Sequence, residues 1–480
     1  MRQHPIAFLR YIYKKFWLLA IPFLRTLTHT ESRELILKNS IYMDIFVLAI
    51  IVIIAVIRWY NTLILTNEKG ITIKSGVLAK KEIFIPFSAV SMVKTGEIFL
   101  VKPFKAIMIC IFTSAETGRK EGKKADCRLL LKLTNYKQIC NKLPHNILKE
   151  KTIFRQSGSR LLLFSFAFSS ILSGAIYFLF MLVQSGGTVK NELERLFVSA
   201  VNDVTIIAEK VIVDMSPFTA AVIVVIMVSW IISFSLNYFR NVNFVSTRDE
   251  KKLMTRNGYF NIVKNYADIR KLSFIDIRQN LMMKLFGVVQ AAASCSGKMI
   301  TIIPFCSKKK ISDFFGMLIP EFCIKKEKFQ SGEKQLFRYI AVPLVMMYGV
   351  ITAGTLSVML YPDWYRLIFF LSVISEMLIL HFCAVRIVSY FTDGVVYTDE
   401  LLLIKYSRFL DFHQIIIPFE RIAEVKIKSS LFQKISSSCD IIIYAAGKKF
   451  SGHKVKGIKI HDAEKIILKV IKENYYETQK

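Results

Sequence analysis

The chain has 480 residues, and 53% of them are hydrophobic, which excludes an ordinary soluble protein and indicates membrane-spanning helices. Its 66 lysines and arginines exceed its 36 acidic residues, so the formal net charge is +30. A length of 480 residues is too great for one ordinary core, so several domains are expected.

Residues 1–59 are predicted to form an N-terminal membrane hairpin. Its second arm, 41–57, is largely apolar and leads into the aromatic pair Trp59-Tyr60, a usual composition for a membrane interface. Its first arm, 6–27, is uncharged only over 16–24. A short span, a re-entrant segment and an interfacial amphipathic helix all fit this arm. By analogy with the paired spans later in the chain, we expect it to span.

Residues 60–150 are predicted to form the first of three small β domains. Apolar residues alternate with polar ones along two short runs, which is the period of half-buried strands, and the runs are Ile71, Ile73 and then Ile83, Ile85. The domain ends in an amphipathic helical pattern made by Tyr136, Ile139, Cys140 and Leu143.

Residues 151–239 are predicted to form a second membrane hairpin, with arms at 161–183 and 217–238. The loop between the arms, 184–216, has three basic and five acidic residues and a strong helical spacing of apolar residues. We expect an amphipathic helix there. The outer leaflet, the protein's own spans or another polypeptide could cover its apolar stripe, and the membrane surface is the default.

The same pattern then repeats, with a divergent second domain at 240–330, a third hairpin at 331–389 and a third domain at 390–480. The hairpin arms are 339–361 and 364–385. Each domain contains several short strands and a closing helix. The predicted fold class is therefore a multi-domain membrane protein. In it, α-helical transmembrane hairpins alternate with three small PH-like β-barrel or sandwich domains, each capped by a C-terminal helix.

On these features the chain resembles the bacterial pleckstrin-homology (PH) membrane proteins of the YdbT type. The matching residues are His4-Pro5, the aromatic exits Tyr60, Tyr238 and Tyr390, and the run from Gly70 to Val90. The second domain departs from the pattern, because Asn265-Tyr266-Ala267-Asp268 replaces the Ile-Pro-Phe of the other two. The resemblance implies no enzyme activity, a membrane-protein partner such as a smaller PH-domain protein, and for some members resistance to antimicrobial peptides.

The positive charge lies almost entirely in the three domains, whereas the 184–216 loop is acidic. By the positive-inside rule the domains are expected to be cytoplasmic, in a multi-pass protein of the cell membrane. Basic domains would then face an anionic lipid surface, and no nucleic-acid partner is needed to explain the charge.

Six lysines are candidate contacts for lipid headgroups or another surface. Lys102, Lys284 and Lys434 occupy the same place in the three domains, each shortly after a strand, while the other three lie in the first domain, at Lys74, Lys80 and Lys81. A phosphate or headgroup contact would use their charge. For the first three, solvated lysines with buried stems and free ammonium groups are the favoured interpretation.

Glu376 is the most unusual single residue, because it falls near the bilayer centre if 364–385 spans. A carboxylate there costs on the order of 3 kcal/mol, so it should be protonated, paired or turned toward other helices. A hydrogen bond between packed helices is favoured, and a proton or ion relay is the alternative.

No catalytic or metal site is predicted, and no cofactor. The seven histidines are dispersed, and the eight cysteines show no CxxC spacing. The predicted function is a non-enzymatic scaffold or binding platform at the inner membrane face, in envelope stress or antimicrobial-peptide resistance. A transporter or channel that uses Glu376, and a membrane enzyme without a recognisable motif, are the alternatives.

Overall fold

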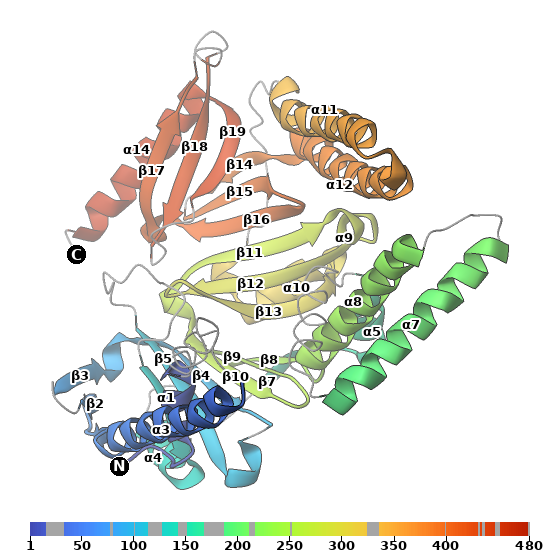
Figure 1. The fold of residues 1–480 in the computed structure, drawn as a ribbon. Coiled ribbons are helices and arrows are strands. Elements are labelled where there is room, and N and C mark those ends of the chain that lie inside the picture. The colour runs from blue at the N-terminus through green and yellow to red at the C-terminus, as the bar shows by residue number, and fades with distance from the viewer. Residues whose placement is uncertain are drawn as a thin grey trace. The chain divides into compact units, whose positions relative to one another are not determined.

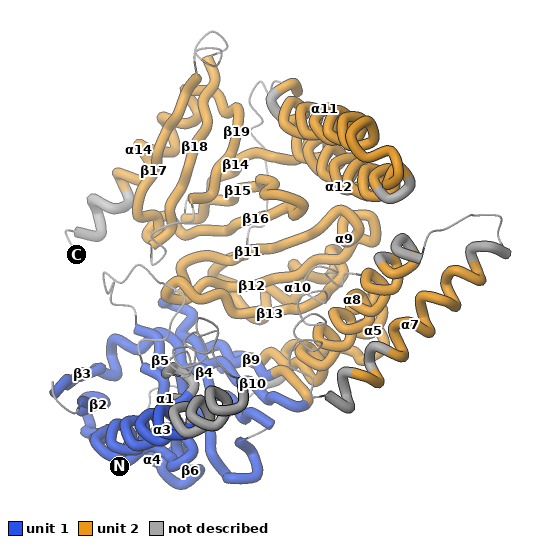
Figure 2. The backbone as a smooth tube through the Cα atoms, viewed as in Figure 1, with its two compact units in different colours: residues 1–151, 248–256, 260–271 blue, residues 152–247, 257–259, 272–480 orange. Residues whose placement is uncertain are grey.

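A computed structural model describes the chain over residues 1–15, 33–76, 80–99, 101–113, 127–142, 151–167, 187–210, 217–249, 252–323, 336–398, 400–430, 433, 437–446 and 452–478. The chain divides into two compact units, which Figure 2 distinguishes by colour. Unit 1 comprises residues 1–151, 248–256 and 260–271, and unit 2 comprises 152–247, 257–259 and 272–480.

The elements of unit 1 are the helices α1 (Ala7–Lys15), α3 (Arg33–Tyr60) and α4 (Leu133–Lys142), the 3-10 turns η2 (Phe87–Ala89), η3 (Lys102–Phe104) and η4 (Ile269–Lys271), and the strands β1 (Leu63–Thr66), β2 (Gly70–Ser75), β3 (Lys81–Pro86), β4 (Val90–Glu97), β5 (Ala106–Thr113), β6 (Cys127–Lys132), β9 (Lys252–Asn257) and β10 (Ile262–Asp268). The strands β7 (Lys151–Arg155) and β8 (Val245–Asp249) have residues in both units, and the last residue of β9, Asn257, belongs to unit 2.

The elements of unit 2 are the helices α5 (Gly158–Ala167), α7 (Gly187–Lys210), α8 (Pro217–Asn241), α9 (Leu281–Leu285), α10 (Lys308–Leu318), α11 (Phe337–Leu360), α12 (Tyr365–Thr392) and α14 (Ile460–Thr478), the turns η5 (Pro320–Phe322), η6 (Pro362–Trp364) and η7 (Phe419–Arg421), and the strands β11 (Leu272–Asn280), β12 (Val288–Cys295), β13 (Lys298–Ser307), β14 (Gly394–Tyr397), β15 (Leu401–Arg408), β16 (Asp411–Pro418), β17 (Ile422–Lys428), β18 (Ser438–Ala445) and β19 (His453–Lys459).

The three predicted domains follow one strand order, and we call them the first module (β1–β6 and α4), the second module (β8–β13 and α10) and the third module (β14–β19 and α14). In each, a 3-10 turn separates the third strand from the fourth, at η2, η4 and η7. The second module therefore has the same turn, although its sequence there differs from the Ile-Pro-Phe of the other two modules. These features confirm the predicted fold class, with small antiparallel sheets, closing helices and long apolar helices.

The first and third modules are sandwiches, because two sheets share one core. In the first, Ile71 and Ile85 from β1–β3 lie in one buried cluster with Leu129 from β6 and Ile139 from α4. In the third, residues from β14–β16 and from β17–β19 cluster with Ile466 of α14. The alternation read from the sequence thus marks the inward faces of the strands, as expected for packed sheets.

The modules are joined by shared sheets, which the sequence analysis did not anticipate. The strand orders are β1-β2-β3, then β6-β5-β4-β10-β9-β8-β7, then β13-β12-β11-β16-β15-β14, and finally β17-β18-β19. The fourth strand of one module therefore pairs with the third strand of the next, as β4 with β10 and as β11 with β16, which Figure 1 shows side by side. We call these pairings the first joint and the second joint.

The two joints have the same register. Val93, the fourth residue of β4, pairs with Tyr266, three residues before η4. Ile275, the fourth residue of β11, pairs with Ile416, three residues before η7. The repeat thus extends from the modules to the way in which they are joined.

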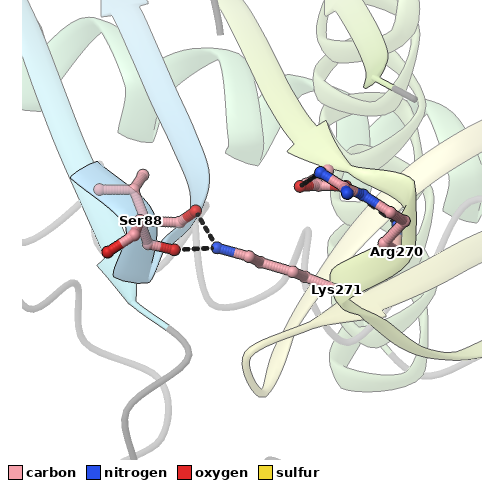
Figure 3. A network of polar contacts seen from close by, with 5 residues as sticks. Ser88, Arg270 and Lys271 are labelled. Carbon is pink, nitrogen blue, oxygen red and sulfur yellow. Dashed lines mark hydrogen bonds and ion pairs between the residues drawn. The ribbon is translucent and has the colours of Figure 1, made fainter. Parts of the chain in front are cut away.

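A side-chain contact reinforces the first joint within unit 1. The ammonium group of Lys271 in η4 donates hydrogen bonds to the carbonyl oxygens of Ser88 and Val90, the latter at 2.9 Å (Figure 3). A neighbouring ion pair, Arg270 to Asp268 at 3.2 Å, closes the same turn. The charged end of η4 is therefore held against the start of β4.

Three helices of the described residues are long and apolar enough to cross a membrane, at Ile223–Asn241, Tyr339–Leu360 and Ile368–Thr392, and Ile45–Tyr60 is a shorter apolar helix. The predicted arm 6–27 is described only over α1, and 161–183 only over part of α5. The remainder of both arms, residue Leu143 of the predicted first closing helix and the ends of the 184–216 loop lie outside the described residues.

The amphipathic helix predicted between the arms of the second hairpin is α7. Part of its apolar stripe packs on α8, where Val201 of α7 clusters with Ala220 and Val224. Leu196 and Ile207 remain exposed. Part of this stripe is therefore covered by α8, which is one of the alternatives left open by the sequence and not the default.

Candidate membrane-contact surface

A short helix after the fourth strand of the second module presents apolar side chains outward. The side chain of Asn280 caps α9 by accepting a hydrogen bond from the amide of Met283 at 2.7 Å, and Met283 is buried in a small cluster. On the other side of α9, Leu285 and Phe286 are 73% and 69% exposed. Large apolar side chains exposed together usually mark a surface that meets a partner or a membrane.

The turn between β15 and β16 presents a further aromatic side chain beside α12. Phe409 is 74% exposed, has a positive φ of 58°, and its ring lies 6.1 Å from that of Phe382. In addition, the guanidinium group of Arg386 donates a hydrogen bond to the hydroxyl of Ser407 at 3.1 Å. The hairpin tip therefore lies along the helix rather than beyond its end.

The length of α12 allows this tip to lie near a membrane boundary. Its 28 residues extend about 42 Å, which exceeds the roughly 30 Å of a hydrocarbon core. Between Trp364, an aromatic at one end, and Arg386 the helix rises about 33 Å, enough to cross the hydrocarbon core. A crossing that begins at Trp364 would end near Arg386, whose long side chain can reach an interface. The ring of Phe409 contacts Phe382, one helical turn before Arg386, so it would lie near the same end of the crossing.

The α9 helix and the β15–β16 tip form one surface, because Asn280 and Asp411 are paired in the second joint. Lys284 of α9 also lies over the ring of Phe412, with its ammonium nitrogen 4.2 Å from the ring centroid. We call Leu285, Phe286 and Phe409, together with Lys284, the tip surface.

The electrostatics of the tip surface are positive. Burial lowers the pKa of Lys284 below its ordinary value, and the nearby charges of Lys308 and Lys405 lower it further, while Asp393 acts in the opposite direction. Lysines close enough to disfavour one another's charge would be stabilised by an added anion. An apolar tip with adjacent lysines is the composition that binds an anionic membrane interface.

Unit 1 contains a corresponding surface at the first joint. Lys102 begins η3 and is exposed, and Phe99 and Phe104 beside it are 58% and 57% exposed. The ring of Phe99 contacts that of Phe260, at the turn between β9 and β10, with centroids 5.9 Å apart. The amide of Phe99 also donates to the side chain of Asn261 at 2.9 Å. Both joints thus combine a repeated lysine with exposed aromatic rings.

The other candidate lysines lie in different surroundings. Lys74 of β2 forms an ion pair with Glu82 of β3 at 3.2 Å, and Lys80 and Lys81 are exposed at the same hairpin. This hairpin is the equivalent of the β9–β10 and β15–β16 hairpins, so the first module has lysines near the tip where the others have aromatic residues. Lys434 lies outside the described residues.

Glu376 lies on α12, as the sequence predicts. It is half-buried, and its Oε1 atom makes no hydrogen bond to the part of the chain that the structure describes. No group of three or more histidine, cysteine, aspartate or glutamate side chains that could hold a metal ion is found among the described residues.

A buried polar group at the second joint was missed by the sequence analysis. The ring of His413 on β16 lies 3.0 Å from the carboxylate of Asp276 on β11, which Arg278 also contacts at 2.5 Å. Burial would raise the pKa of Asp276, but hydrogen bonding to His413 and the charges of His413 and Arg278 hold it below its ordinary value. No local motif could reveal a pair separated by 137 residues.

Comparisons with known proteins agree with this architecture. The family described as bacterial PH domain matches three regions, residues 17–130, 196–315 and 348–474, each of which includes an apolar helix and most of a module. The chain is also 22% identical over 162 residues to the UPF0699 transmembrane protein YdbT of Bacillus subtilis strain 168. That match covers 30% of this chain and 33% of YdbT, so it spans about a third of either protein. Since the three regions together cover more than half of the chain, this membrane protein belongs to the bacterial PH domain family.

Proposed function

We propose that this protein is a non-enzymatic scaffold at the inner face of the cell membrane, where its three PH-like modules are cytoplasmic and contact anionic lipid. The observation that carries the proposal is the tip surface, where Leu285, Phe286 and Phe409 are exposed together with Lys284. This surface is continuous with a hairpin that runs along α12.

The joints support a scaffold rather than three independent binding domains. Because β11 and β16 are paired over six residues, the second and third modules share a sheet. A shared sheet fixes the relative position of the lysines and aromatic rings on either side of it. Several weak lipid contacts held in this way act together, since the second binding event becomes intramolecular.

The distribution of charge supports the cytoplasmic orientation. Lysine and arginine are concentrated in the modules, and basic segments next to spans favour the cytoplasmic side. The finer role that we propose is in the response of the cell envelope to stress, including resistance to antimicrobial peptides.

Cysteine labelling tests the orientation. Single cysteines are placed at Ser75 in β2 and at Ser185 and Ser216 in the acidic loop, and intact cells are treated with a membrane-impermeant thiol reagent. Labelled positions are identified by mass spectrometry of the purified protein, so that the eight native cysteines do not interfere. We expect labelling at Ser185 and Ser216 and none at Ser75. External labelling at Ser75 would contradict both the orientation and the scaffold function.

A further inference from the structure

Two strands, β3 and β17, have one edge without a partner strand among the described strands. The equivalent edges in the other modules form the joints. Among the described strands, β3 pairs only with β2, although the third strands β10 and β16 each also pair with the preceding module. In the same way β17 pairs only with β18, although β4 and β11 also pair with the following module. Unpaired strand edges are templates for the addition of another strand.

The outer face of the first sheet exposes apolar residues at positions that are buried in the third module. In the third module Val396, Leu403 and Ile416 form one row across β14, β15 and β16, and all three are buried. The equivalent row in the first module is Leu65, Thr72 and Phe84. There, the apolar residues at the two ends are exposed, Leu65 at 44% and Phe84 at 53%, while Thr72 between them is buried.

The residue at the position of Phe84 has a defined role in the joints. Its equivalents Tyr266 and Ile416 are the residues that pair with Val93 and Ile275 of the preceding module. Tyr266 also packs against the core of the first module. Phe84 is thus an apolar residue placed to contact the core of a preceding module.

The strand β17 differs from the fourth strands that form the joints, because its third residue is charged. The third residue of β4 is Met92 and that of β11 is Phe274, and both are buried. Phe274 is part of the core of the third module, so this position inserts into the next module. In β17 the third residue is Glu424, which is exposed and pairs with Lys426 at 3.0 Å.

Charge also opposes pairing between two copies of this chain. In the register of the joints, Val425 of β17 would pair with Phe84 of a second copy, and Lys428 would lie opposite Lys81. Glu424 would enter a position that is buried at both joints, where an unpaired carboxylate is strongly disfavoured. Like charges directly opposite each other are destabilising as well.

We propose that β3 and the outer face of its sheet bind the fourth strand of a PH-like module on another polypeptide, one with an apolar residue where this chain has Met92 and Phe274. The interface would continue the pattern of the two joints, with Phe84 opposite the fourth residue of the incoming strand. Glu424 prevents copies of this chain from occupying the site themselves. The inference does not depend on lipid binding.

The test replaces Glu424 of β17 by an apolar residue, so that β17 of one copy can pair with β3 of another. One tagged copy of the full-length protein carries Glu424→Phe and Lys428→Cys, and a differently tagged copy carries Lys81→Cys. The two are mixed in detergent with a short bis-thiol crosslinker, and the crosslinked heterodimer is measured. We expect at least tenfold more heterodimer than with a donor that retains Glu424.

The controls address register and non-specific adhesion. Moving the acceptor cysteine to Glu82, which points to the opposite face of the sheet, should abolish crosslinking. Adding Phe84→Glu to the acceptor should do the same. A donor with Ala423→Phe, which adds an equal apolar group at a neighbouring exposed position, should not crosslink.

Three results would overturn the proposal. Equal crosslinking by the donor that retains Glu424 would show that a second copy is the natural occupant. No crosslinking by the Glu424→Phe donor would show that β3 does not accept a strand. Crosslinking that survives Phe84→Glu would show that the contact lies elsewhere.

Discussion

Replacing Phe274 by alanine should destabilise the third module although the residue belongs to the second. Phe274 is 2% exposed and lies in the third module's buried cluster, with its ring 4.8 Å from that of His453. Removing a buried phenylalanine ring costs about 3–5 kcal/mol. Each 1.4 kcal/mol is about a factor of ten. Amides that exchange through opening of the third module should therefore exchange roughly two to three and a half orders of magnitude faster.

Hydrogen exchange of the full-length protein, read by mass spectrometry, measures this effect strand by strand. The matched control is Ile277→Ala, because Ile277 lies on the same strand but on its opposite face. For Phe274→Ala we expect the loss of protection in β17–β19 and α14. For Ile277→Ala we expect it in β12 and β13. Equal patterns for the two variants would refute the conclusion that β11 contributes to both cores.

Three further predictions concern the second joint, the repeated lysines and the membrane helix. Asp276→Asn should weaken protection of β16 by about 2 kcal/mol at pH 7. The pKa of Asp276 is lowered in the folded state, so its contribution is complete above its ordinary pKa of 3.8 and is lost as pH falls through the lower folded value. The difference between variant and wild type should therefore persist at pH 5, and its loss by pH 5 would contradict the assignment. Changing Lys102, Lys284 and Lys434 together to Glu should lower the share of phosphatidylglycerol that copurifies with the protein. This effect should shrink in high salt, since each basic residue contributes about 1 kcal/mol at an anionic surface, and an unchanged share at low salt would count against headgroup contact. Glu376→Gln should keep normal abundance and complement whatever phenotype a deletion strain shows, because it preserves hydrogen-bonding shape without a charge. A normally abundant but inactive variant would instead favour transport.

The sequence was sufficient for features that depend on local pattern. The alternation at Ile71, Ile73, Ile83 and Ile85 marks strands whose inward residues are buried or half-buried, and the closing helices follow their apolar spacing. Helix length and hydropathy likewise predicted α8, α11 and α12. In each case the signal lies within a few neighbouring residues.

The joints could not be predicted in this way, because edge strands pair through backbone groups that every residue carries. Lys102 and Lys284 look equivalent in sequence, yet Lys284 lies over Phe412, a ring from the next module, and Lys102 is exposed. The structure also explains why the second module has Tyr266 in the segment where the other modules have Ile-Pro-Phe. This residue packs against the core of the first module.

Contact between the tip surface and lipid is the central claim, and photocrosslinking tests it directly. A benzophenone amino acid replaces Phe409 in the full-length protein, which is reconstituted in vesicles that contain phosphatidylglycerol, irradiated and analysed for lipid adducts. Ile427, exposed on β17, is the matched control in the same unit. We expect lipid adducts at position 409 and few or none at 427. Absence of adducts at 409, or equal yields at both positions, would contradict it.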